Sequence, residues 1–88
     1  ILVSTNNINL KSVSVAADTV IDGNLTSRCI YLRGRSSVDG FLIRNGNDFG
    51  KGAGIFVFEA GTILNCIFTN NIAAGTGGGA IYAHNTLI

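Results

Sequence analysis

Apolar residues occur along this chain in short alternating runs that return at a nearly constant interval. Residues 38–45 (VDGFLIRN) align without gaps with residues 63–70 (ILNCIFTN), 25 positions later. A shorter copy, residues 19–23 (TVIDG), aligns with residues 41–45 (FLIRN) at a spacing of 22. Strict alternation over a few residues is the pattern of a short β-strand, so each copy predicts a strand followed by a turn.

A second set of apolar runs interleaves with the first. Its members are residues 29–32 (CIYL), 54–57 (GIFV) and 80–83 (AIYA), spaced by 25 and 26 positions. Residues 8–10 (INL) lie 22 positions before residues 30–32 (IYL) and are taken as an earlier member of this set. The spacing varies because the connectors, rich in Asn and Gly, differ in length.

A repeat of 22 to 26 residues that holds two or three short strands cannot bury its apolar face alone, so its copies must stack. Parallel pairing of each strand with the equivalent strand of the next repeat forms the coil of a parallel β-helix. We therefore predict an all-β fold, a right-handed parallel β-helix of about three to four rungs with little or no α-helix. Residues 1–88 are expected to form one partial solenoid with rungs near 5–24, 25–47, 48–71 and 72–88.

Alternation also predicts which side chains face the interior. Two columns of inward residues are expected: Ile30, Leu32, Ile55, Val57, Ile81 and Ala83 in one, and Thr19, Ile21, Phe41, Ile43, Cys66 and Phe68 in the other. Tyr31, Phe56 and Tyr82 then form an outward column of rings about 4.8 Å apart. This column is the candidate ligand-binding surface, for sugar rings or for apolar side chains of a partner. The alternative is a surface that flanking residues cover.

Two further outward features follow from the same alignment. Asn45 and Asn70 fall one rung apart at a bend, where asparagine tolerates left-handed backbone angles, and they predict a structural asparagine ladder. Val20, Leu42 and Ile67, with Leu64 nearby, form a second apolar outer stripe. Such stripes indicate that a tail, a helix or a second copy packs there.

Composition agrees with strands and excludes several classes of protein. The chain is 47% hydrophobic and 12% charged, and 24 of its 88 residues are Ile, Val or Thr. This argues against disorder and for β-structure. A net charge of +1 predicts no nucleic-acid partner, and no apolar stretch approaches the length of a membrane span.

Catalytic and metal-binding patterns are weak. The acids are Asp18, Asp22, Asp39, Asp48 and Glu59, and no two fall in adjacent rungs of the alignment. Asp22 falls opposite Arg44, which predicts an ion pair at the surface. The glycine run at residues 46–52 lacks phosphate-loop spacing. Cys29 and Cys66 fall in different columns and predict free thiols, which with His84 cannot complete a four-ligand zinc site. We therefore assign no catalytic residue, metal or cofactor.

Residues 19–23 (TVIDG), 65–71 (NCIFTNN) and 77–82 (GGGAIY) resemble the repeats of right-handed parallel β-helix proteins of the pectate-lyase-like kind, above all bacterial extracellular and polymorphic outer-membrane repeat proteins. Phe68 departs from the Phe-x-x-Asn form of those repeats, since Asn70 follows at the second position. The resemblance implies a secreted or cell-surface location. It leaves function open, because this coil carries lyases, hydrolases and adhesins.

Two functions are expected from these observations. The first is a non-catalytic scaffold or adhesin-like stalk segment that binds a polysaccharide or a surface protein through its outer faces. The alternative is a fragment of a polysaccharide lyase or glycoside hydrolase whose catalytic rungs lie elsewhere. Unpaired strands near Ile8 and Ile81 also predict self-association through open ends or through the apolar outer faces.

Overall fold

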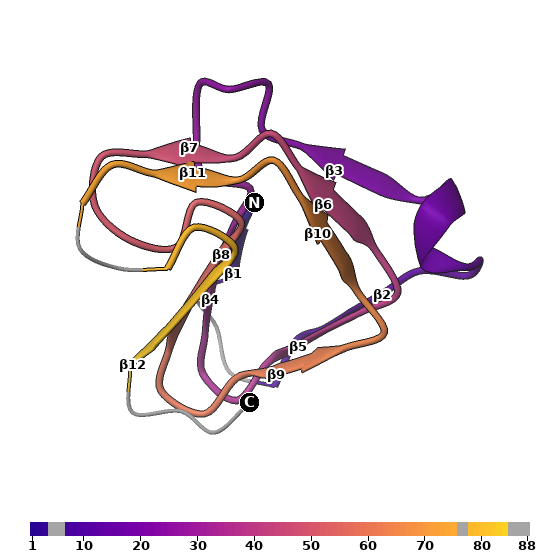
Figure 1. Cartoon of the computed structure of the whole chain (residues 1–88). Helices are drawn as coiled ribbons and strands as arrows, with labels where there is room; N and C mark the ends of the chain where they lie inside the picture. Colours follow the sequence, from indigo (N-terminus) through magenta and orange to yellow (C-terminus); the bar gives the residue numbers. More distant parts are fainter. Residues whose placement is uncertain (4–6, 76–77, 85–88) are drawn as a thin grey trace.

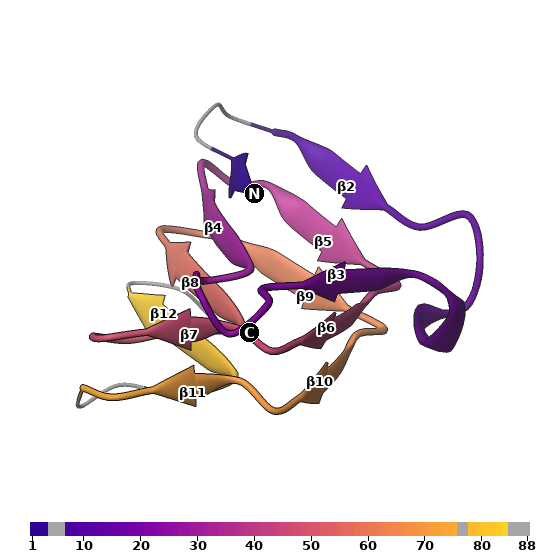
Figure 2. The ribbon, with the colours of Figure 1, turned by 90° about the horizontal axis from the view of Figure 1, so that it is seen from above.

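The computed structural model describes residues 1–3, 7–75 and 78–84, and it is a parallel β-solenoid (Figure 1). Every strand pairs in parallel with the equivalent strand of a neighbouring turn. Seen down the coil axis, three sheets close a triangle and a fourth, shorter sheet leads back to the first. The view at right angles shows the turns stacked on one another (Figure 2). The predicted all-β parallel coil is confirmed.

The four sheets are named A to D in the order in which each turn of the chain visits them. Sheet A contains β1 (Leu2–Val3), β4 (Ile30–Arg33), β8 (Ile55–Phe58) and β12 (Ile81–His84). Sheet B contains β2 (Asn9–Lys11), β5 (Ser37–Asp39) and β9 (Thr62–Leu64). Sheet C contains β3 (Val20–Asp22), β6 (Leu42–Arg44) and β10 (Ile67–Thr69). Sheet D contains β7 (Asn47–Asp48) and β11 (Ile72–Ala73).

The register of sheets A and C is the one that the repeats predict. Ile30 pairs with Ile55, and Ile55 with Ile81. In sheet C, Ile21 pairs with Ile43, which pairs with Phe68. Residues one repeat apart are therefore vertical neighbours, and the coil completes three turns between β1 and β12.

The expected place of residues 8–10 beside residues 30–32 is wrong. Leu10 pairs with Val38 in sheet B, and Leu2 occupies the position beside Tyr31 in sheet A. The first turn is longer because the segment between β2 and β3 carries η1 (Ala16–Asp18), a short 3-10 turn that projects from the coil (Figure 2). The spacing from Leu2 to Tyr31 is consequently 29 residues, where later turns take 25 or 26.

The core lies in the strands that have a neighbouring strand on both sides: β4 and β8 in sheet A, β5 in sheet B and β6 in sheet C. The largest side chains with no exposed surface are Ile30, Leu32, Val38, Ile43, Ile55 and Val57. Inward residues of the outer turns, such as Ile21, Ile63 and Phe68, are only half-buried because each has a neighbour on one side. Burial of each aliphatic side chain contributes about 1.5–3 kcal/mol before conformational entropy is subtracted.

The corners between sheets explain the repeated Asn and Gly. A left-handed backbone recurs at equivalent positions of the second and third turns, as in the pairs Gly34 and Glu59, Arg35 and Ala60, Gly40 and Asn65, and Asn45 and Asn70. Glycine adopts this conformation freely, and asparagine adopts it more readily than other residues. The corners after sheets B and C are thus the ones that carry Gly or Asn in both turns, whereas the corner after sheet A also places Arg35, Glu59 and Ala60 in this conformation.

Candidate functional site

The outward aromatic residues of sheet A form one continuous column. Tyr31, Phe56 and Tyr82 come from β4, β8 and β12 and pair in register. The ring centroids of Tyr31 and Phe56 are 5.4 Å apart with their planes 2° from parallel, and those of Phe56 and Tyr82 are 5.2 Å apart with a 35° tilt. Leu2, which is 69% exposed, pairs with Tyr31 and extends the column by one turn. The structure therefore brings the three predicted residues together.

Two cationic side chains, Arg28 and Lys51, lie over these rings. The guanidinium carbon of Arg28 lies 4.9 Å from the ring centroid of Phe56 and 5.8 Å from that of Tyr31. The ammonium of Lys51 lies 4.6 Å from the Tyr82 centroid and donates to the Tyr82 hydroxyl at 3.3 Å. Each such contact is worth about 0.5–1 kcal/mol at an exposed site.

This geometry decides which parts of the column a ligand can reach. Phe56 has a tyrosine ring on either side along the coil axis, so its faces are largely occupied by its neighbours. All three side chains are half-buried. A ligand at this surface would therefore meet ring edges and the hydroxyls of Tyr31 and Tyr82 more than open ring faces.

A polar ladder runs along the corner that follows sheet C. The side-chain amide of Asn70 donates to the side-chain oxygen of Asn45 at 2.8 Å. Asn45 in turn donates to both carboxylate oxygens of Asp22, at 3.2 and 3.3 Å. Both asparagines have left-handed backbones, with φ of 56° and 53°. The ladder thus links all three turns on the outside of the coil.

Asp22 is the most heavily engaged carboxylate at this corner. It accepts from the backbone N–H of Asn24 at 2.8 Å and from Nε of Arg44 at 3.0 Å. The Asn24 bond, followed by the bonds from Arg44 and Asn45, lowers the pKa of Asp22 below its ordinary value. The ion pair with Arg44 that the alignment predicts is therefore present. A carboxylate held ionised in this way is suited to structure more than to proton transfer.

The two cysteines are free thiols in different environments. Cys29 is buried, and its sulfur donates to the carbonyl of Arg44 at 3.3 Å. Burial is the main cause that raises the pKa of the Cys29 thiol. Cys66 is half-buried and lies directly before β10. Within the described residues, no three His, Cys, Asp or Glu side chains are grouped as metal ligands would be.

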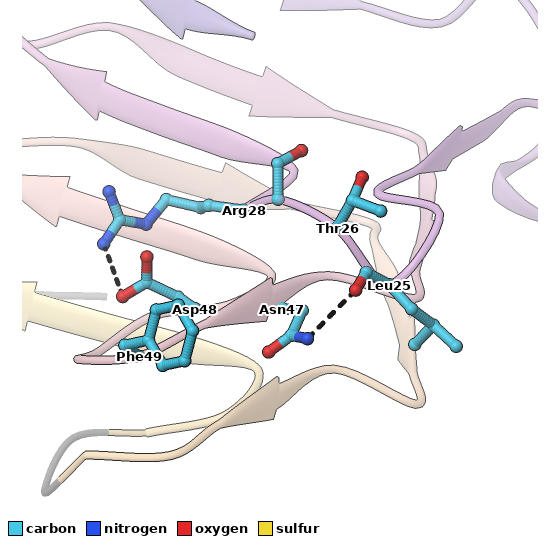
Figure 3. Close-up of a pocket in the computed structure, with 7 residues that line it drawn as sticks. Leu25, Thr26, Arg28, Asn47, Asp48 and Phe49 are labelled. Atoms are coloured by element: carbon cyan, nitrogen blue, oxygen red, sulfur yellow. Dashed lines mark hydrogen bonds and ion pairs between the residues drawn. The ribbon is translucent and has the colours of Figure 1, made fainter.

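A pocket of about 500 Å³ lies beside the aromatic column, at sheet D (Figure 3). One wall is the connector from β3 to β4, and the other is β7 with the residue that follows it. Its lining residues are Leu25, Thr26, Ser27, Arg28, Asn47, Asp48 and Phe49. The Arg28 guanidinium pairs with Asp48 at 3.2 Å, so one side chain reaches both the pocket and the column.

The sequence patterns did not point to this pocket or to Leu2. Phe49 is 94% exposed in a connector that is otherwise Gly, Asn, Asp and Lys. A single aromatic residue in such a polar connector is the signal that could have marked the pocket, because aromatic side chains are typical of the linings of ligand pockets. Leu2 was missed because the longer first turn moves it out of the 25-residue spacing.

Among the residues that the structure describes, no helix has the length and apolar character needed to cross a membrane. No family model, curated protein or solved structure matches this chain.

Proposed function

We propose that this chain is a non-catalytic scaffold or adhesin-like stalk segment of a secreted or cell-surface bacterial β-helix protein, and that it binds glycan or protein through its outer faces. The resemblance of its repeats to pectate-lyase-like and outer-membrane repeat proteins supports this assignment. The observation that carries it is the column of Tyr31, Phe56 and Tyr82, which runs across consecutive turns on the outside of sheet A.

The outer surface also ties successive turns together. Besides the ladder through Asn45, the amide of Asn65 donates to Asp39 at 3.0 Å, and the hydroxyl of Ser37 donates to Asn9 at 2.7 Å. These bonds connect side chains 26 and 28 residues apart. Such cross-links are what a rigid spacer requires, because each resists separation of one turn from the next.

Incubation of the chain with a glycan array tests the proposal. Retention without cleavage is the expected result, and Tyr82→Ala should reduce it if the column forms part of the surface. Cleavage of array glycans would overturn the proposal in favour of the polysaccharide lyase or glycoside hydrolase alternative. Retention that is unchanged in Tyr82→Ala would exclude the column as the contact.

A further inference from the structure

The pocket beside sheet D has walls from two successive turns that hydrogen bonds fix in place. The backbone N–H of Asn47 donates to the carbonyl of Ser27 at 2.9 Å, and its side-chain amide donates to the carbonyl of Leu25 at 2.9 Å (Figure 3). Arg28 binds the opposite wall through Asp48 and through the carbonyls of Lys51 and Gly52. The cavity therefore exists before any ligand arrives, which lowers the entropic cost of binding.

Two apolar side chains of the pocket lining are exposed to solvent. Phe49 is 94% exposed and Leu25 is 49% exposed, so neither contributes much to the core. Leu25 also has a left-handed backbone, with φ of 57°, where glycine or asparagine would be less strained. Among the residues that the structure describes, Phe49 stacks on no other ring, so its face is available to a ligand, in contrast to the face of Phe56.

The polar lining combines occupied and open hydrogen-bonding groups. Oδ2 of Asp48 accepts from Arg28 and from the backbone N–H groups of Gly50 and Lys51, at 3.2, 2.9 and 3.1 Å. These bonds fix the carboxylate, and within the described residues no donor meets its other oxygen, Oδ1. Within the described residues, no donor meets the side-chain oxygen of Asn47 either, while its amide nitrogen donates to the carbonyl of Leu25. Both oxygens are acceptors for hydroxyl groups.

Charge narrows the class of ligand. Arg28 and Asp48 form an ion pair and leave no net charge in the lining. Because these two charges offset each other, neither an anionic nor a cationic ligand gains a net electrostatic attraction from the lining. A ring with an apolar C–H face and several hydroxyl donors satisfies both kinds of lining, and a volume of about 500 Å³ accommodates one such ring.

The geometry points to a binding site for one neutral pyranose unit, stacked on Phe49 and hydrogen-bonded to Asn47 and Asp48. This inference rests on the proposed glycan-binding function and locates it beside the aromatic column, with Arg28 shared between the two surfaces. The site recognises the sugar by its hydroxyls and its C–H face and catalyses no reaction.

Titration of the labelled 88-residue chain with methyl glycosides of glucose, galactose, mannose and N-acetylglucosamine, followed by amide NMR, tests the site. Saturable shifts confined to residues 25–28 and 47–49 are expected with at least one of these glycosides. Phe49→Ala should weaken that binding by about 10-fold, because it removes the stacking ring, and Phe49→Tyr should retain it. Val13→Ala removes an equally exposed apolar side chain far from the pocket and should change nothing.

Three results would overturn the inference. These are the absence of saturable shifts with all four glycosides, equal binding of methyl glucuronide and methyl glucoside, and equal shifts with cyclohexanol, which would show an unspecific apolar patch. The glycan array distinguishes failure of the pocket inference from failure of the proposed function. Glycan retention that survives Phe49→Ala but not Tyr82→Ala refutes the pocket alone, whereas cleavage refutes the non-catalytic role alone.

Discussion

The side-chain amide of Asn70 donates a 2.8 Å hydrogen bond to the side-chain oxygen of Asn45, one full turn of the coil away. Asn45 repeats the contact by donating to Asp22 in the turn beyond. The same residue type thus serves two needs at one position. It adopts the left-handed backbone of the corner, and its amide joins neighbouring turns.

Replacement of Asn45 should separate these two contributions. Asn45→Ala removes the bonds to Asn70 and Asp22 and places a Cβ-bearing residue without a polar side chain at φ of 56°, so we expect a loss of about 1–2 kcal/mol in the free energy of unfolding. Asn45→Gly should cost less, since it removes only the bonds. Asn24→Ala is a matched control, because Asn24 has the same φ of 56° and contributes only its backbone N–H, which alanine retains, to the bonds at Asp22. Urea denaturation in which Asn24→Ala costs as much as Asn45→Ala would show that the ladder contributes nothing.

Burial in the internal strands of the sheets should dominate stability. Ile55→Ala deletes a side chain with no exposed surface and should cost about 2–5 kcal/mol, enough to unfold much of a domain of this size. Ile72→Ala makes the same chemical change at a residue that is 52% exposed and should cost well under half as much. Thermal unfolding of the two variants gives the comparison, and equal losses would contradict the assignment of faces.

Stability should depend on the ionisation of Asp22. Its pKa is lowered in the folded chain, so the unfolded state binds the proton more readily. The stabilising contribution is therefore fully present above the ordinary value of 3.8 and is lost as the pH falls through the lower, folded value. Asp22→Asn should flatten this part of the stability profile. An NMR titration of the carboxyl group that places its midpoint at or above 3.8 would contradict the hydrogen bonds from Asn24, Arg44 and Asn45 described for it.

The two thiols should differ in reactivity. Burial shields Cys29 and raises the pKa of its thiol, so little thiolate is present near neutral pH. Cys66 is half-buried and should react first with iodoacetamide in the native chain. Mass spectrometry with and without denaturant measures both, and native alkylation of Cys29 as fast as that of Cys66 would show that the interior of the coil is open.

The sequence predicts the pairing of β4, β8 and β12 in sheet A and of the strands in sheet C because these strands repeat an apolar alternation. The second and later turns also carry a ring or an asparagine at a fixed place. Ile30, Ile55 and Ile81 are the same residue type at the same inward position of successive turns, so the strand register can be predicted from the sequence. The predicted aromatic column depends only on that register. The prediction for the first turn was wrong because the longer connector in this turn places Leu10 beside Val38 in sheet B instead of beside Leu32 in sheet A. Residues 8–10 form an apolar pattern too short to distinguish these two positions.

The pocket could not be predicted for a different reason. Its walls, Leu25 and Asn47, are 22 residues apart and do not occupy equivalent strands, and sheet D has only two residues per strand. Alternation cannot be recognised over two residues. The orientation of the rings could not be predicted from the sequence either. The strand register fixes the spacing of Tyr31 and Phe56 along the coil but not the angle between their ring planes.

Methyl NOEs among three isoleucines test the vertical stacking on which the fold, the aromatic column and the pocket all depend. In a chain with labelled isoleucine methyl groups, we expect cross-peaks from Ile30 to Ile55 and from Ile55 to Ile81, and none from Ile30 to Ile81, since these are successive partners in sheet A. Absence of the Ile30–Ile55 cross-peak in a folded sample, or a direct contact between Ile30 and Ile81, would contradict the parallel solenoid.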